Sequence, residues 1–233
     1  MRKRIFKRLS GLLCEEQFSN LCNSHVLIVG IGGVGGYVAE FLARSGVGAL
    51  SIIDHDVVEE SNINRQVVAL NSTIGKPKVE VMKNRILDIN PDCRVFSVAQ
   101  RFSEENADQI LSIDYDFVVD CIDDVPNKCL LIERCLNKRM KIISSMGAGR
   151  RFNLMNFVVC DIFDTKYDKL AKKMRSELKK IGITKHMVVC SNQPNDDNSG
   201  GDIASVCYNP CACACVLSHY VINNLAGESE GER

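Results

Sequence analysis

A glycine-rich turn, Gly30-Ile-Gly-Gly-Val-Gly35, separates an unbroken apolar run from a segment whose apolar residues recur at helical spacing. The run before the turn, 25–29, is typical of a strand that is covered on both faces. A second apolar run, 50–53, follows the helical segment and ends at Asp54. This order of strand, glycine turn, helix, strand and acidic residue predicts a βαβ unit that binds a nucleotide.

The alternation of strand and helix patterns continues to about residue 149. Short apolar runs indicate strands at 94–98, 117–119 and 142–143, and amphipathic spacing indicates helices at 34–45, 79–89, 104–111 and 125–137. We therefore expect an α/β, Rossmann-like doubly wound fold with a mainly parallel sheet and helices on both faces.

The pattern changes after residue 149, where we expect a smaller C-terminal extension. It contains strands at 153–159 and 187–190, helices at 166–180 and 210–225, and a polar, turn-rich loop at 191–202. We predict one domain over 5–225, with a nucleotide-binding core at 24–149 and a substrate and dimer part at 150–225. An acidic tail occupies 226–233.

The overall charge and hydropathy narrow the class of protein. Lys and Arg total 29 and Asp and Glu total 29, so the formal net charge is zero, which disfavours a generally basic nucleic-acid binder and an acidic disordered protein. The longest apolar stretch, 26–39, contains five glycines and is too short to span a bilayer. The apolar segment near the start is too short for an export signal, so the 12 cysteines are expected to be reduced thiols in the cytoplasm.

The glycines at 30, 32, 33 and 35 suit the close approach of a backbone to phosphate groups. Glycine allows a tight turn, and the N–H groups of the following helix can then meet an anion. Asp54, at the carboxyl end of the second strand, can accept hydrogen bonds from ribose hydroxyls. The alternative is a turn selected for helix–strand packing, but that would not explain Asp54.

Two cations and an amide follow at the same predicted edge of the sheet. Asn62 and Arg65 lie in Ser61-Asn-Ile-Asn-Arg-Gln66, and Lys78 opens the next helix. Several cations suit a triphosphate such as ATP better than a dinucleotide. Solvated surface charges are the alternative for both cations.

Asp123 ends a later strand, which the usual strand order places beside the first. The carboxylate would then face the glycine turn, and Mg²⁺ typically takes one or two carboxylates together with substrate phosphates. The alternative is an N-cap for the helix that begins near Pro126.

Several motifs together resemble one family. They are IGGVGGYVAEFLARSGVGALSIIDHDVVEESNINRQ, GKPKVEVM, INPDC and DCIDD, and they look like the adenylation domain of the ubiquitin-activating, ThiF-like superfamily. Phe6-Lys-Arg8, MGAG at 146–149, the segment 168–178 and MVVCSNQP make the chain most similar to bacterial-type tRNA threonylcarbamoyladenosine dehydratases.

The resemblance implies a role for each matching residue. The residues that bind ATP would be Gly30, Gly32, Gly33, Gly35, Asp54, Asn62, Arg65, Gln66 and Lys78. Asp123 would be linked to magnesium, and Arg8 would reach into the partner's site of a homodimer. Catalysis would then depend on Arg8, Arg65, Lys78 and Asp123.

Two residues depart from the family pattern, and one segment is unusual. Gly36 replaces a frequent Ser, and Cys14 stands where Gly is common. The sequence has no CxxC pair, but Cys211, Cys213 and Cys215 alternate in 207–215. These three are expected to be small packing residues; a soft metal and a catalytic or redox-sensing thiol are the alternatives. Five further cysteines in apolar segments are expected to pack as small hydrophobes: Cys93, Cys121, Cys129, Cys135 and Cys160.

Basic residues gather in two places, 166–185 and 2–8. Such clusters could follow an RNA backbone, with a solvated helix face as the alternative.

The main hypothesis is ATP-dependent dehydration and cyclisation of threonylcarbamoyladenosine in tRNA, through adenylation of the threonyl carboxylate. The expected partners are that tRNA and a second copy of the chain, with a sulfur-transfer or desulfurase system left open and no membrane. The alternatives are adenylation of the C-terminus of a ubiquitin-like sulfur carrier, a nicotinamide dehydrogenase and a non-catalytic nucleotide-binding module.

Overall fold

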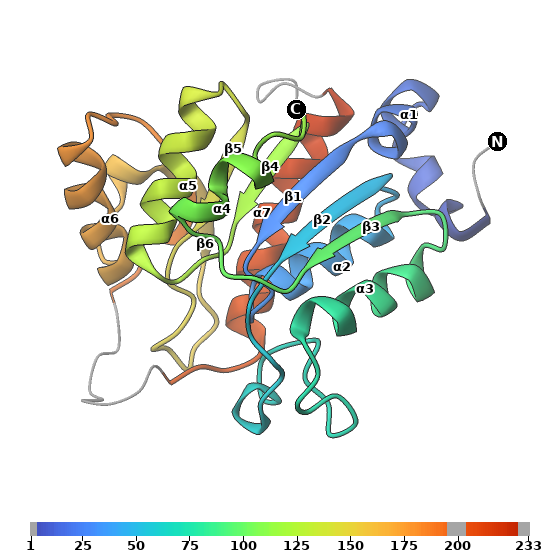
Figure 1. The fold of residues 1–233 in the computed structure, drawn as a ribbon, viewed down its shortest axis with the longest axis horizontal. Helices are drawn as coiled ribbons and strands as arrows, with labels where there is room; N and C mark the ends of the chain where they lie inside the picture. The colour runs from blue at the N-terminus through green and yellow to red at the C-terminus, as the bar shows by residue number, and fades with distance from the viewer. Residues whose placement is uncertain (1–3, 195–203, 228–233) are drawn as a thin grey trace.

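The fold is built around a seven-stranded sheet (Figure 1). The structure, a computed structural model, describes residues 4–194 and 204–227. The strands are β1 (His25–Val29), β2 (Ala49–Ile53), β3 (Arg94–Val98), β4 (Phe117–Asp120), β5 (Ile142–Ser145), β6 (Phe157–Asp161) and β7 (Met187–Ser191).

The strand order is β3-β2-β1-β4-β5-β7-β6. All neighbouring strands are parallel except β6 and β7, which pair antiparallel. Because β1 lies between β2 and β4, the chain leaves β1 at the switch point of the sheet, where a crevice opens beyond the strand ends. The expected fold class is confirmed.

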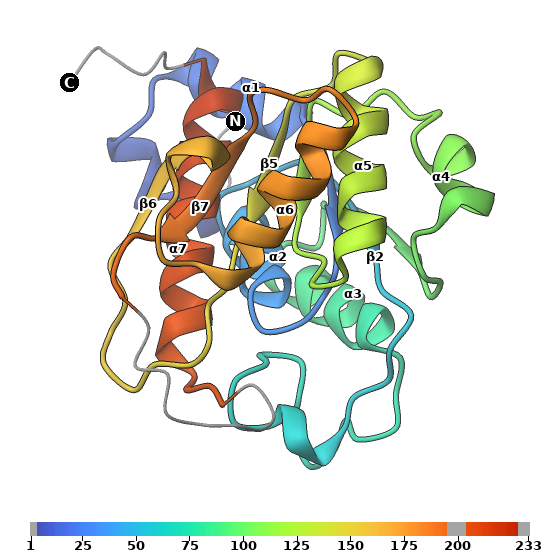
Figure 2. The ribbon, with the colours of Figure 1, turned by 90° about the vertical axis from the view of Figure 1, so that its left-hand side faces the viewer.

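Helices cover both faces of the sheet (Figure 2). They are α1 (Glu15–Asn23), α2 (Gly35–Arg44), α3 (Lys78–Ile89), α4 (Glu104–Ile110), α5 (Val125–Asn137), α6 (Lys169–Lys180) and α7 (Tyr208–Ala226). Short 3-10 turns occur at Arg4–Phe6, Leu9–Gly11, Glu60–Asn62 and Ile162–Asp164.

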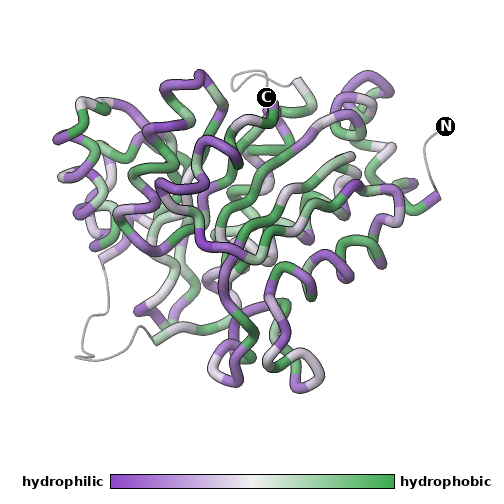
Figure 3. The backbone as a smooth tube through the Cα atoms, in the orientation of Figure 1, coloured by the Kyte–Doolittle hydropathy of each residue, from purple (hydrophilic) through white to green (hydrophobic). Residues whose placement is uncertain are grey.

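Alternate residues of β1 supply two separate cores. Val26 and Ile28 pack with α1, α2, α3 and α7, whereas Leu27 and Val29 pack with α4, α5 and α6. A strand covered on both faces must be apolar at successive positions, which is why 25–29 reads as an unbroken run. The central strands accordingly carry mostly hydrophobic colours in Figure 3.

Helix α1 was not predicted from the sequence. Its buried residues are Phe18 and Leu21, too few to stand out as a periodic pattern. Cys14, one of the departures from the family pattern, caps this helix: its Sγ accepts from the Gln17 N–H at 3.4 Å, and the Gln17 side chain accepts from the Cys14 N–H at 2.8 Å. The helix therefore begins through local hydrogen bonds.

Two predicted elements begin later than expected. Strand β6 starts at Phe157 rather than 153, because 153–156 is held by Asn209 of α7, whose side chain bonds the Met155 N–H and the Asn153 carbonyl. Helix α6 starts at Lys169 rather than 166, because Asp168 caps it through the Ala171 N–H.

Residues 195–202 of the predicted loop and residues 228–233 of the predicted acidic tail lie outside the described residues. Among the residues that are described, no helix is long and apolar enough to cross a membrane.

Candidate active site

A cleft of about 980 Å³ lies beyond the carboxyl ends of β1, β2, β4 and β5. It is lined by the glycine turn, by the segment between β2 and α3, by the β4–α5 junction and by the first turn of α6. Most predicted site residues line this one cleft: Gly30, Gly32, Gly33, Asp54, Asn62, Arg65, Gln66, Lys78 and Asp123. Gly35 and Arg8 do not.

The glycines of the turn are required for different reasons. Gly30 has φ +94°, and a Cβ there would lie 2.6 Å from the Cys121 carbonyl oxygen. A Cβ on Gly35 would lie 1.8 Å from the Gly30 carbonyl oxygen, so the turn leaves no room for a side chain at position 35. A Cβ on Gly32 would meet no atom within 4 Å, although Gly32 lines the cleft. Packing therefore explains Gly30 and Gly35 but not Gly32.

Asp54 holds the glycine turn in place. One carboxylate oxygen accepts from the Ile31 N–H at 2.6 Å, and the other accepts from the Asp56 N–H at 2.8 Å. The carboxylate is nearly buried but borders the cleft. Each oxygen keeps lone-pair capacity for a ribose hydroxyl, so the arrangement is compatible with the predicted role.

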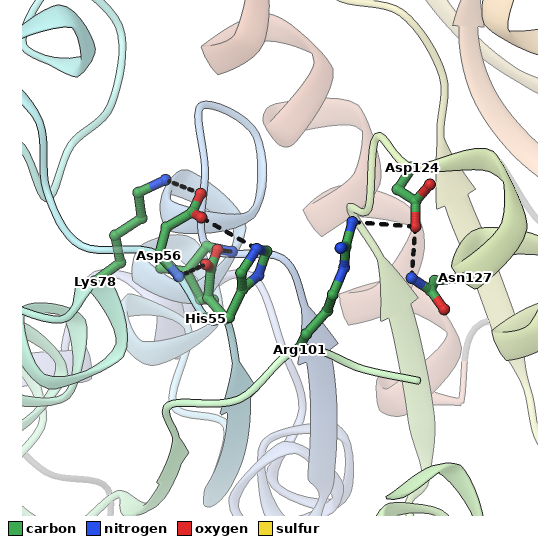
Figure 4. A network of polar contacts seen from close by, with 8 residues as sticks. His55, Asp56, Lys78, Arg101, Asp124 and Asn127 are labelled. Carbon is green, nitrogen blue, oxygen red and sulfur yellow. Dashed lines mark hydrogen bonds and ion pairs between the residues drawn. The ribbon is translucent and has the colours of Figure 1, made fainter. Parts of the chain in front are cut away.

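The predicted phosphate-binding cations enter the cleft from the segment after β2. Lys78 is almost buried, and its Nζ lies 2.7 Å from Asp56 Oδ2 (Figure 4). Burial alone would raise the pKa of Asp56, but the hydrogen bond and charge of Lys78 lower it below its ordinary value. The Arg65 guanidinium donates to the Ser61 carbonyl at 2.8 Å and to Asn64 Oδ1 at 2.9 Å. Both cations are therefore held in position before a ligand arrives.

Two amides lie beside these cations. Asn62 closes a tight turn, because its Oδ1 accepts from the Glu59 N–H at 3.2 Å. Gln66 Oε1 is buried at the cleft and has no hydrogen-bond partner among the described residues. A buried acceptor without a donor is costly, so this atom is free to accept a hydrogen bond from a ligand.

Asp123 is exposed in the cleft, and Asp124 rather than Asp123 occupies the N-cap position of α5. The Asp124 side chain contacts Arg101 and Asn127 (Figure 4). The proposed alternative for Asp123, a helix cap, is therefore wrong. Its carboxylate, together with phosphate oxygens, is the kind of donor set that Mg²⁺ takes.

A buried polar network beneath the cleft was not predicted. Asp120 and Lys128 are fully buried and 2.9 Å apart, and the Lys128 ammonium also donates to the Ile122 carbonyl at 2.9 Å. Ser144 Oγ donates to Asp120 Oδ2 at 2.6 Å and lies 2.7 Å from His186 Nε2. Burial, and then the charge of Lys128, lower the pKa of His186 to about 3.

The network fixes the turn that presents Asp123, because Asp120 also accepts from the Ile122 N–H at 3.0 Å. A signal for it was present in the sequence. Lys128 lies three and four residues before the buried Leu131 and Ile132, on the apolar side of its helix.

Arg8 is exposed and lies away from the cleft of its own chain. Its neighbour Phe6 packs on Phe18 of α1 and lies near Gly46, which follows α2. This is the end of the sheet where the strands begin. A catalytic role for Arg8 therefore requires a second copy of the chain, as the resemblance implied.

The cysteines of α7 do not form a metal site among the described residues. Cys213 is fully buried, as expected for a packing residue, and burial raises the pKa of its thiol. Cys215 is exposed, so the packing prediction is wrong for this residue. Within the described ranges, the group whose donor atoms converge as a metal site would require is Asp54, His55 and Asp56, and Asp56 already pairs with Lys78.

Of the other cysteines expected to pack, Cys93 and Cys135 are buried and Cys121, Cys129 and Cys160 are partly buried. The glycine at 36, the second departure from the family pattern, also has a local reason. A Cβ there would lie 3.1 Å from Val67 Cγ1, so a larger residue would require Val67 to shift.

Comparison with known proteins assigns the class. The ThiF family matches residues 6–227, so the chain belongs to the ThiF family. Among its relatives is the tRNA threonylcarbamoyladenosine dehydratase of Bacillus subtilis, 42% identical over 79% of this chain and 72% of the relative. The enzyme of the same name from Escherichia coli is 40% identical over 78% of this chain and 68% of the relative.

Solved structures agree with this assignment. The E. coli tRNA N6-threonylcarbamoyladenosine dehydratase in complex with ATP has a TM-score of 0.90 and 32% identity, and the match covers 95% of this chain and 93% of that one. A complex of the E. coli enzyme with AMP has a TM-score of 0.87.

A relative with a different name matches a smaller part of this chain. The adenylyltransferase and sulfurtransferase MOCS3 of Drosophila yakuba is 40% identical over 53% of this chain and 27% of the relative. The comparisons therefore do not favour a sulfur-carrier substrate.

Proposed function

We propose that this protein dehydrates threonylcarbamoyladenosine in tRNA to its cyclic form, with ATP as the activating substrate. The observation that carries the proposal is the meeting of the glycine turn, Arg65, Lys78 and Asp123 in one cleft at the switch point of the sheet. Support comes from two relatives that are named tRNA threonylcarbamoyladenosine dehydratase. They match 79% and 78% of this chain.

The reaction has two steps. A carboxylate oxygen of the threonyl group attacks the α-phosphorus of ATP, and pyrophosphate leaves. The carbamoyl nitrogen then attacks the activated carbonyl carbon, loses its proton and closes the ring as AMP leaves. The net change in the nucleoside is the loss of one water.

The protein positions the reactants and offsets negative charge. Arg65 and Lys78 lie where the phosphates would bind, Asp54 orients the ribose, and the Gln66 acceptor receives a donor from the nucleotide. Asp123 is the residue that would hold Mg²⁺, which when bound would neutralise phosphate charge.

The proposed assembly is a homodimer in which Arg8 of one copy completes the site of the other. We also propose a cytoplasmic location for the enzyme. A sulfur-transfer partner is not needed for the two steps above.

The test is incubation of the purified protein with ATP, magnesium and tRNA that carries threonylcarbamoyladenosine, followed by mass spectrometry of the nucleosides. We expect the substrate nucleoside to lose 18 Da, which is one water, with release of about one AMP and one pyrophosphate per ring closed. Unchanged nucleoside, or AMP released only with a sulfur-carrier protein, would refute the proposal.

A further inference from the structure

The cleft extends beyond the nucleotide half towards α6. This second half is lined by residues 147–150, after β5, and by Lys169, Leu170 and Lys173. Asp168 joins the two parts: its Oδ1 accepts from the Ala171 N–H at 2.7 Å and its Oδ2 from the Gly147 N–H at 2.8 Å. The first turn of α6 is therefore fixed against the cleft wall.

The basic residues in the C-terminal half of α6 have partners within the protein. Arg175 donates to the Thr165 carbonyl at 3.0 Å, and Lys180 lies 2.7 Å from Glu177. Lys179 lies over the ring of Phe163, 5.6 Å from its centroid. These three side chains already have partners on the protein, so they are less available to an RNA phosphate than an unpartnered lysine side chain is.

Lys173 differs from these residues. It is exposed and lines the cleft, and its side chain has no hydrogen bond or ion pair with any described residue. Lys169 lies one turn earlier on the same side of the helix, and Arg150 contributes a third cation from the loop after β5. Asp168, which lines the same wall, is 8% exposed and already accepts two backbone hydrogen bonds. Among the described residues, this half of the cleft therefore presents three cations and one carboxylate.

We infer that Lys173, together with Lys169 and Arg150, binds a backbone phosphate of the RNA beside the nucleotide that is adenylated. This inference rests on the proposed function. The phosphates of ATP are matched by Arg65 and Lys78, which enter from the segment between β2 and α3, on the other side of β1 (Figure 1). A second phosphate site across the cleft suits a substrate that is part of a polynucleotide, since backbone phosphates supply most of the binding affinity for nucleic acids.

The test compares Lys173→Gln with Lys172→Gln. Lys172 is a matched control, because it is the preceding residue of α6, is also exposed and has no side-chain partner among the described residues, but does not line the cleft. Binding of tRNA that carries threonylcarbamoyladenosine is measured from 50 to 300 mM KCl, and KM is measured separately for ATP and for tRNA.

We expect Lys173→Gln to weaken tRNA binding about fivefold at low salt and to make the log–log salt dependence shallower by about 0.7 to 0.9, the slope of one phosphate contact. The KM for ATP should stay within twofold of wild type. Lys172→Gln should match wild type in all these measurements.

Three outcomes would overturn the inference. Equal tRNA binding by the two variants would show that Lys173 does not contact RNA. A raised KM for ATP with unchanged tRNA binding would assign Lys173 to the triphosphate. Failure of the wild-type protein to bind the tRNA would overturn the proposed function as well. The first two outcomes, in contrast, would overturn only the role of Lys173.

Discussion

Gly32 and Gly35 belong to the same turn but have opposite surroundings. A methyl group on Gly35 would overlap the Gly30 carbonyl, whereas one on Gly32 would enter open space in the cleft. The two positions therefore separate a requirement of the fold from a requirement of ligand binding.

We predict that Gly35→Ala lowers the free energy of unfolding by about 3 kcal/mol, because the backbone must shift to relieve the overlap. Gly32→Ala should leave the unfolding temperature unchanged and weaken ATP binding about tenfold or more, because the methyl group would occupy space that the phosphates approach. Thermal unfolding and calorimetric titration with ATP measure both effects. Wild-type ATP affinity in Gly32→Ala would mean that the turn serves packing alone.

At the phosphate end of the cleft, Arg65→Ala and Asp123→Ala should each reduce turnover about 100-fold, the usual cost of losing one preorganised electrostatic group. Arg94→Ala and Asp114→Ala are the controls, because both residues are exposed and lie at the opposite end of the sheet, where β3 and β4 begin. Near-normal turnover in both site variants, measured as AMP release with tRNA, would refute these roles.

At the scale of elements, strands β4 and β5, the residue before β7 and helix α5 meet in a buried network. Asp120, Lys128, Ser144 and His186 are each at most 3% exposed. Removing one partner of a buried ion pair strongly destabilises a protein. The network therefore holds the β4–α5 turn in one conformation, and this fixes the position of Asp123.

His186 gives this network a measurable pH dependence. Its pKa falls from 6.5 to about 3 on folding. Below pH 6.5 the unfolded chain binds a proton at this position and the folded chain does not, so stability falls as the pH drops from 6.5 towards 3.

Lowering the pH from 7.5 to 5.5 should cost wild type about 1 kcal/mol more than it costs His186→Gln. Urea unfolding of both proteins at the two pH values measures the difference. Equal losses would show that His186 is not held neutral in the fold.

The sequence predicted the central elements well because their signals are local. The buried runs of β1 and β2, the glycine turn and the regular helix patterns each depend on neighbouring residues. Helix α1 was missed because it buries few apolar residues, and the start of β6 was misplaced because it depends on Asn209, far away in the chain.

The residues of the candidate site were predicted about as well as the central strands and helices. Parallel strand ends bring Asp54, Lys78 and Asp123 to one edge, so a correct strand order was enough to group them. The Lys78–Asp56 pair and the contact of Ser144 with His186 depend on side-chain directions in the folded protein, which spacing alone does not determine.

At the scale of the whole molecule, Arg8 lies at the end of the sheet opposite its own cleft. If Arg8 acts in a second copy of the chain, an inactive Arg8→Ala protein and an inactive Arg65→Ala protein should complement each other. A mixed dimer then has one site with both changes and one intact site.

After unfolding together and refolding, the mixture should recover roughly a quarter of wild-type activity, because about half of the dimers are mixed and half of their sites are intact. Each variant refolded alone is the control. No recovery in the mixture, with dimers present by light scattering, would contradict the proposed exchange of Arg8.

The central claim is that the cleft delivers the α-phosphorus of ATP to a carboxylate of the tRNA. The most direct test uses tRNA whose threonyl carboxylate is labelled with ¹⁸O at both oxygens, followed by mass spectrometry of the AMP released. We predict that each AMP carries one ¹⁸O atom, because a carboxylate oxygen leaves with the phosphate when the ring closes. Unlabelled AMP formed together with the cyclised nucleoside would contradict this mechanism.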